Sequence, residues 1–220
     1  SAATDTTPPS VVGVTTTNSN TIVVTFSETV TGASIADFNL TPALNITNVS
    51  CTGNVCTLTT ADQSTTPYSL STNNDGGIQD SATPANTLST GSTTFTGDGK
   101  PYIVAIYPVD SSTVMVEWSE PIGNAASVNI ADYNITNATI TGAALDPSDP
   151  SKFVKLTISP ALTSGDSYTL TYTDGAPTSV DSSGNPTLTT VPGGGTFTGP
   201  TSTQAPQVTS ASSNAATVVL

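Results

Sequence analysis

The segment TIVVTFSE (Thr21–Glu28) recurs as TVMVEWSE (Thr113–Glu120), 92 positions later (113 − 21 = 92). In both copies apolar residues occupy every second position, a pattern typical of a strand with one buried face. The preceding segments match at the same spacing, since PSVVGV (Pro9–Val14) corresponds to PYIVAI (Pro101–Ile106). The chain therefore contains an internal duplication whose unit begins with two strands.

Further blocks repeat later in each copy. They are ADFNLT (Ala36–Thr41) with ADYNIT (Ala131–Thr136), YSLS (Tyr68–Ser71) with YTLT (Tyr168–Thr171), and FTG (Phe95–Gly97) with FTG (Phe197–Gly199). The spacing grows to 102 positions (197 − 95 = 102), and insertions of this kind belong in loops. A third copy begins with PQVTS (Pro206–Ser210) and TVVL (Thr217–Leu220). We expect it to continue in a longer array or to be completed by a neighbouring chain.

Short apolar runs separated by turn residues predict about seven strands in each repeat. No segment keeps an apolar face at helical spacing for three turns. The sequence therefore predicts an all-β protein of tandem immunoglobulin-like β-sandwiches with the start of a third repeat. The expected parts are a linker or N-terminal extension (1–8), repeat 1 (9–98), repeat 2 (99–199), and a linker with the first strands of the third repeat (200–220).

The repeated blocks resemble those of a known family. The FSE and WSE strand ends, the ADFN and ADYN blocks, YTLTY (Tyr168–Tyr172) and VDSSGN (Val180–Asn185) are similar to bacterial Ig-like repeats of the swimming-protein (SwmB) and S-layer type. The first copy departs from this pattern, because IQDSAT (Ile78–Thr83) lacks the Gly-Asn ending. The resemblance implies a non-catalytic role in S-layers, adhesin stalks, surface fibres or spacers of secreted enzymes.

The charge of the chain excludes several classes of function. The net charge is −13, the only basic residues are Lys100, Lys152 and Lys155, and neither Arg nor His occurs. No basic stripe for nucleic acid can be built, and an anionic membrane would repel the chain. No apolar run approaches the ~20 residues that cross a bilayer. We expect no enzymatic activity, since the chain has no His for a general base and no Arg. Paired carboxylates could serve a glycosidase, but the acidic residues fall at strand ends and turns.

Cys51 and Cys56 flank a four-residue segment, TGNV, that suits the tip of a hairpin. The spacing favours a disulfide, with a pair of reduced structural thiols as the alternative. Zinc is not expected, since a structural site needs four ligands. A disulfide implies an oxidising compartment, so we expect an extracellular or cell-surface location.

Calcium is the one cofactor that the sequence suggests, because it prefers carboxylate and carbonyl oxygens in loops. The candidate ligands lie at strand ends and turns that correspond between repeats, or in the linker: Glu28, Asp75, Asp80, Asp98, Glu120, Asp174 and Asp181. We expect them to gather at one end of each sandwich, at the domain junction. The alternative is ordinary turn chemistry, in which Asp bonds to nearby backbone.

Glycosylation is a second possible modification. Five Asn-x-Ser/Thr sequons are present, at Asn39, Asn45, Asn48, Asn134 and Asn137. Asn39 and Asn134 occupy equivalent positions, although a chain rich in Asn and Thr also forms sequons by chance.

These features favour a structural segment of an extracellular surface protein, an S-layer lattice or surface fibre subunit. Its partners are expected to be copies of itself or further repeats of a longer chain. The alternative is an adhesin stalk or a carbohydrate-binding or spacer module of a secreted protein. A sugar-binding face needs exposed aromatic rings. Six aromatic residues occupy repeated positions expected to face the core, which leaves Tyr102 and Tyr107 as exceptions.

Overall fold

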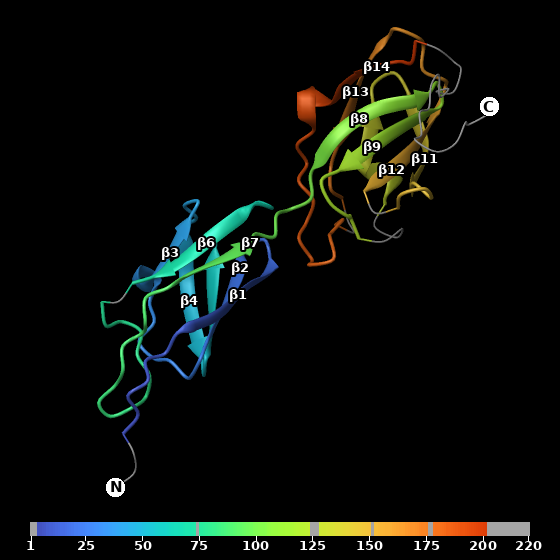
Figure 1. The fold of residues 1–220 in the computed structure, drawn as a ribbon. Helices are drawn as coiled ribbons and strands as arrows, with labels where there is room; N and C mark the ends of the chain where they lie inside the picture. Colours follow the sequence, from blue (N-terminus) through green and yellow to red (C-terminus); the bar gives the residue numbers. More distant parts are fainter. Residues whose placement is uncertain (1–3, 74, 124–127, 151, 176–177, 202–220) are drawn as a thin grey trace, which may run out of the picture. The chain divides into compact units, whose positions relative to one another are not determined.

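The structure is a computed structural model that describes residues 4–73, 75–123, 128–150, 152–175 and 178–201 (Figure 1). The chain divides into two compact units. Unit 1 holds Ser1–Lys100 with Ser183–Asn185, and unit 2 holds the rest of the chain from Pro101. The expected third repeat, residues 206–220, lies outside the described residues.

Unit 1 is an antiparallel β-sandwich of seven strands. They are β1 (Val11–Asn18), β2 (Thr21–Phe26), β3 (Phe38–Thr41), β4 (Ile46–Thr52), β5 (Val55–Thr60), β6 (Pro67–Thr72) and β7 (Ser92–Thr96), with the 3-10 turn η1 (Ile35–Asp37) before β3. One sheet has the order β1-β2-β5-β4 and the other β3-β6-β7. This is the strand order of an immunoglobulin constant-type sandwich.

Unit 2 repeats this arrangement strand for strand. Its elements are β8 (Ile103–Asp110), β9 (Thr113–Trp118), η3 (Ile130–Asp132), β10 (Tyr133–Ile135), β11 (Thr139–Leu145), β12 (Phe153–Ser159), β13 (Ser167–Tyr172), η4 (Pro192–Gly195) and β14 (Thr196–Thr198). The sheet orders are β11-β12-β9-β8 and β10-β13-β14. The predicted all-β fold of two immunoglobulin-like sandwiches is therefore confirmed.

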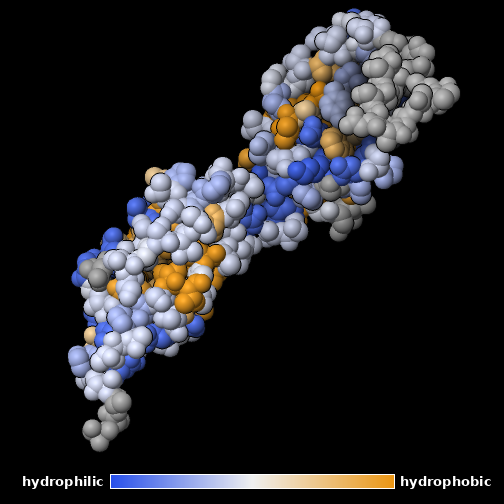
Figure 2. All heavy atoms as spheres, viewed as in Figure 1, coloured by the Kyte–Doolittle hydropathy of each residue, from blue (hydrophilic) through white to orange (hydrophobic). Residues whose placement is uncertain are grey.

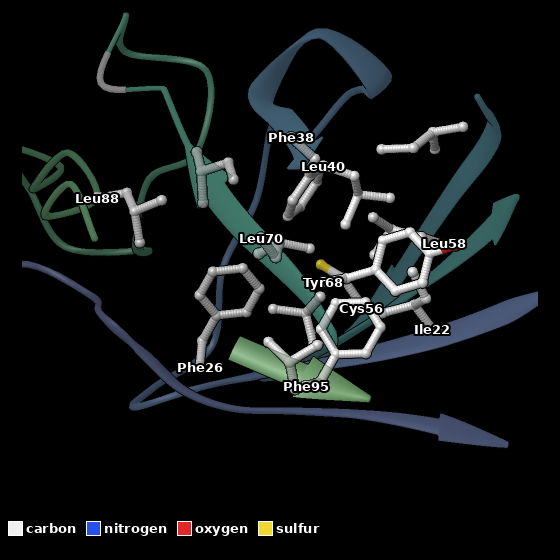
Figure 3. Packing of buried hydrophobic residues seen from close by; sticks show 14 of the residues in the cluster. Ile22, Phe26, Phe38, Leu40, Cys56, Leu58, Tyr68, Leu70, Leu88 and Phe95 are labelled. Atoms are coloured by element: carbon white, nitrogen blue, oxygen red, sulfur yellow. The ribbon is translucent and has the colours of Figure 1, made fainter. Parts of the chain in front are cut away.

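The alternation in β2 explains the core of unit 1. Ile22, Val24 and Phe26 are buried, whereas the residues between them are only half-buried. In the pairing with β5, Ile22 lies opposite Leu58 and Val24 opposite Cys56. Figure 3 shows the Cys56 sulfur inside this cluster, with Phe26 and Leu88 to one side of it.

Trp118 occupies the position of Phe26 in unit 2. Phe26 lies opposite Val11 across the first strand pair, and Trp118 lies opposite Ile103 in the same way. Both rings are buried, as their repeated position predicts. The indole of Trp118 packs edge-on against the ring of Tyr172, with the centroids 5.1 Å apart.

Each unit also contains a tyrosine corner that fixes the turn before its sixth strand. The hydroxyl of Tyr68 accepts the Ser64 amide at 3.2 Å, and that of Tyr168 accepts the Thr163 amide at 2.8 Å. The two rings stack on Phe95 and Phe197 with centroids 5.6 and 5.7 Å apart. Figure 3 shows the Tyr68 ring beside Phe95.

The repeated FTG block has a steric reason. A Cβ at Gly97 would lie 2.4 Å from the Ser64 carbonyl oxygen and 2.6 Å from the Tyr68 ring. A Cβ at Gly199 would lie 2.1 Å from the Thr163 carbonyl oxygen. Only glycine therefore lets the chain pass the tyrosine corner at this distance.

The visible surface is mostly polar, with hydrophobic side chains in patches on both units (Figure 2). Within the described ranges, no helix has the length and apolar character needed to cross a membrane.

Candidate functional site

Three carboxylates of unit 1 come together around the loop after β2. Asp5 precedes β1, Glu28 follows β2, and Asp80 lies in the connection between β6 and β7. One oxygen from each lies within 4.8 Å of the others. The sequence predicted two of the three, Glu28 and Asp80. It did not predict Asp5, which lies in the N-terminal extension.

Asp80 is 3% exposed and is fixed by amide donors. Its Oδ1 accepts the Ala82 amide at 3.0 Å and the Asn86 amide at 2.7 Å, and its Oδ2 accepts Nδ2 of Asn86 at 2.7 Å. Burial raises the pKa of Asp80, but the donors from Asn86 and Ala82 together lower it below its ordinary value. Asp80 is therefore held as a carboxylate by three hydrogen bonds within its turn.

Glu28 responds in the opposite direction. Its pKa is raised, first by desolvation and then by the negative charges of Asp5 and Asp80. The cluster thus brings three carboxylates close enough to repel one another. Such a group of oxygens suits a hard cation such as calcium, which would offset the repulsion. Both oxygens of Asp80 already accept hydrogen bonds, so Asp5 and Glu28 would have to supply most of the coordination. Calcium at these residues stays a prediction.

Unit 2 repeats part of this arrangement. Ser27, before Glu28, accepts the Ser10 amide on its Oγ at 3.0 Å, and Ser119, before Glu120, accepts the Tyr102 amide at 3.1 Å. Carboxylate oxygens of Glu120 and Asp181 lie within 4.8 Å of each other. The pair of Glu28 and Asp80 therefore recurs with the fold.

The remaining predicted ligands behave differently. Oδ1 of Asp75 accepts the Gly77 amide at 3.0 Å, and Oδ1 of Asp174 accepts the Ser179 amide at 2.8 Å. These contacts are the turn chemistry that the sequence left as the alternative. Within the part of the chain that is described, neither residue belongs to a group of three possible metal ligands. Asp98 is half-buried in unit 1, and its amide donates to Oε1 of Gln63 at 3.3 Å.

Asp132 was not predicted as a site residue but is the most unusual carboxylate of unit 2. It is 2% exposed, its Oδ1 accepts the Gly175 amide at 3.1 Å, and its Oδ2 finds no hydrogen-bond partner among the described residues. Desolvation raises its pKa, the Gly175 amide lowers it, and the charge of Asp174 raises it, with a net upward shift. The equivalent Asp37 of unit 1 is satisfied, since its Oδ2 accepts the amide and the hydroxyl of Ser34 at 2.6 and 2.8 Å.

The predicted disulfide is present, joining Cys51 and Cys56. These residues lie directly opposite each other on β4 and β5, and Gly53 and Asn54 form the turn between the strands. Nδ2 of Asn54 donates to the Phe26 carbonyl at 3.1 Å, which ties the hairpin tip to the end of β2.

The asparagines of the five sequons are all exposed: Asn39 on β3, Asn45 before β4, Asn48 on β4, Asn134 on β10 and Asn137 after β10. Exposure leaves each side chain accessible for modification. Glycosylation itself stays a prediction.

The chain matches no known family model and no curated protein. The solved structures that it resembles include three of S-layer proteins. The N-terminal part of the bacterial S-layer protein SbsC is 21% identical with a TM-score of 0.38, over 87% of this chain and 44% of that one. The S-layer protein rSbsC(31-844) is 16% identical with a TM-score of 0.37, over 80% of this chain and 34% of that one. SbsC domains 1-6 are 15% identical with a TM-score of 0.38, over 89% of this chain and 38% of that one.

The present chain thus spans less than half the length of each of these structures. TM-scores of this size do not demonstrate a common arrangement. The functional argument therefore rests on the residues of this chain.

Proposed function

We propose that this chain is a non-catalytic structural segment of an extracellular surface protein, in which repeated β-sandwiches build an S-layer lattice or surface fibre. The observation that carries the proposal is the repetition of one sandwich. Both units have the same order of seven strands and the same tyrosine corner. Stacked repeats of one unit are a means of gaining length and contact surface.

The chemical inventory supports a structural role. The chain has neither His nor Arg, and both cysteines form the disulfide. Several of its Asp side chains accept hydrogen bonds from turn backbone, as Asp75, Asp110 and Asp146 do. A disulfide persists in oxidising surroundings, in keeping with a place outside the cell.

The alternative function as a sugar-binding or spacer module has less support. Five rings pack into the two cores in addition to the stacked pair in each tyrosine corner: Phe26, Phe38, Trp118, Tyr133 and Tyr172. Tyr102 and Tyr107 are exposed, as the sequence predicted. A sugar platform needs neighbouring rings, and no contact between these two is observed in the described residues.

Surface labelling of intact cells tests the proposal. A membrane-impermeant amine reagent should modify Lys152 and Lys155, which are exposed, before the cells are lysed. Quantitative mass spectrometry should also find the protein among the most abundant surface proteins, because a lattice or fibre needs many copies. Labelling only after lysis would contradict the surface location, and a low copy number would favour the adhesin or spacer alternative.

A further inference from the structure

Unit 2 carries an apolar groove beside the start of β8. Its lining residues are Tyr102, Ile103, Val104, Leu188, Thr190 and Pro192, around a volume of about 400 Å³. Tyr102 is 49% and Leu188 41% exposed, so large apolar side chains meet water here. Figure 2 shows hydrophobic side chains gathered on unit 2 next to β8 and η4.

The equivalent surface of unit 1 has the same backbone but different side chains. The Leu188 amide donates to the Pro101 carbonyl at 2.8 Å, and the Ser89 amide donates to the Pro9 carbonyl at 2.9 Å. This correspondence places Ser89 at the position of Leu188. The bond from Ser119 to Tyr102 likewise matches the bond from Ser27 to Ser10. Two serines of unit 1 are thus replaced by tyrosine and leucine, and the fold does not require either replacement.

The charge distribution indicates what can cover the groove. Residues 101–109 and 186–201, which supply the lining, contain no charged residue, although the whole chain carries a net charge of −13. Two copies of so acidic a chain repel each other across most of their surfaces. Association between copies is therefore least opposed where both partners present an uncharged apolar face.

The edge of β8 favours packing of side chains over a continuous backbone ladder. β8 is the last strand of its sheet, but its pairing with β9 shifts register between Ile103 and Ala105 and again between Pro108 and Asp110. Bulges and proline on an edge strand hinder the addition of another strand. The apolar side chains at its start remain available.

From these observations we propose that the groove is a contact between two copies of this chain. Tyr102 and Leu188 of one copy pack into the groove of the second, and the same residues of the second pack into the first. Such a contact is isologous, with the same patch on both partners. A buried tyrosine is a common anchor of such interfaces. The inference rests on the proposed function, because it identifies the surface through which the surface protein would assemble.

Sedimentation equilibrium of the 220-residue chain at concentrations up to ~1 mM tests the contact. The wild type should associate reversibly, and a weak contact is sufficient because a lattice makes many contacts at once. The variant Tyr102→Ser/Leu188→Ser carries the residues that unit 1 has, so it should fold normally and associate at least about tenfold more weakly. Leu188→Glu should likewise prevent association by placing charge in the groove.

The matched control is Val12→Ser in unit 1. Val12 is 62% exposed on β1, at the position that corresponds to Val104, and it does not line the groove. This variant should associate like the wild type. Unchanged near-ultraviolet circular dichroism establishes that each variant retains its fold.

Three results would overturn the proposal: a wild type that stays monomeric at ~1 mM, a double variant that associates like the wild type, or loss of association when the chain is shortened after Thr201. The last result would identify residues 202–220 as the occupant of the groove. The two proposals can fail separately. If association depends on Tyr102 and Leu188 but surface labelling of intact cells does not modify the chain, the contact stands and the proposed function is rejected.

Discussion

The two units fill equivalent positions of their cores with different side chains. In unit 1, Ile78 and Leu88 are buried in the connection between β6 and β7, and Thr72 ends β6. In unit 2 the counterparts of Ile78 and Leu88 are Ser179 and Thr187. The Leu88 amide donates to the Ile78 carbonyl, and the Thr187 amide donates to the Ser179 carbonyl in the same way.

The space that these smaller residues leave in unit 2 is occupied by an aromatic ring. Tyr172 stands at the position of Thr72, since Phe38 pairs with Thr72 and Tyr133 pairs with Tyr172. Its hydroxyl lies 2.9 Å from Oγ1 of Thr187. Tyr172 and Thr187 of unit 2 thus stand where unit 1 has Thr72 and Leu88. The exchange moves the large side chain from one position to the other and gives the tyrosine hydroxyl a partner.

Truncation of the central ring should have the largest effect in either unit. Trp118→Ala should destabilise unit 2 by about 3–5 kcal/mol, and Phe26→Ala should destabilise unit 1 by a similar amount. Hydrogen exchange measured by mass spectrometry reports each unit separately in the intact chain. Loss of protection confined to the unit that carries the substitution is expected. Equal loss in both units would show that they do not hold separate cores.

The disulfide should give the second largest effect, and only in unit 1. Because Cys51 and Cys56 close a small loop, Cys51→Ala/Cys56→Ala should destabilise unit 1 by about 2 kcal/mol. Protection of unit 2 should be unchanged, and a reducing agent should lower the stability of the wild type but not that of the variant. If reduction left the wild-type melting curve unaltered, the cross-link would not contribute to stability.

Removing the hydroxyl should have different effects on stability at the equivalent positions Tyr172 and Thr72. Tyr172→Phe removes the hydroxyl that contacts Thr187 and should destabilise unit 2 by about 1 kcal/mol. Thr72→Val removes a buried hydroxyl that has no partner in the described part of the chain, so it should be neutral or should stabilise unit 1 by up to about 1 kcal/mol. Destabilisation by both changes would mean that Thr72 makes a contact equivalent to that of Tyr172.

The carboxylates should give a smaller effect that depends on pH. The pKa of Glu28 is higher in the folded chain than its ordinary value of 4.5, so the folded state binds more protons than the unfolded state between the two values. The free energy of unfolding therefore falls as pH rises through this window. Glu28→Gln should flatten that slope in unit 1, whereas Glu120→Gln should leave unit 1 unchanged. If the pH dependence of the free energy of unfolding were unchanged in Glu28→Gln, the raised pKa of Glu28 would not contribute to stability.

Calcium should act on the same residues if the sequence-based prediction is right. Millimolar calcium should raise the melting temperature of unit 1 in the wild type, because it offsets the repulsion among Asp5, Glu28 and Asp80. The increase should be smaller in Glu28→Gln. A melting curve that excess chelator does not alter in purified native protein would reject the prediction.

Much of the fold follows from the sequence because the duplication supplies two independent versions of each strand. Alternation around Phe26 and Trp118 identified the buried faces, and the Gly-Asn segment between the cysteines identified a hairpin. The tyrosine corners were not predicted, since a hydroxyl bonded to backbone four or five residues upstream leaves no periodic signal.

The candidate sites were less predictable for a geometric reason. Glu28 and Asp80 could be aligned with Glu120 and Asp181 between the copies, but Asp5 joins them only through the path of the N-terminal segment. The groove combines Tyr102 with Leu188, which are distant in sequence and have serine counterparts in unit 1. Comparison of the copies position by position at exposed sites would have identified this difference, whereas a search for shared motifs overlooks it.

Cryo-electron tomography of the native cell surface, with an antibody against this chain, tests the structural role most directly. Repeated sandwiches that assemble through copies of themselves predict label at regular intervals on a lattice or along fibres, with density the size of one sandwich between contacts. Label scattered singly over the surface, or found only on a secreted enzyme in the medium, would contradict the account.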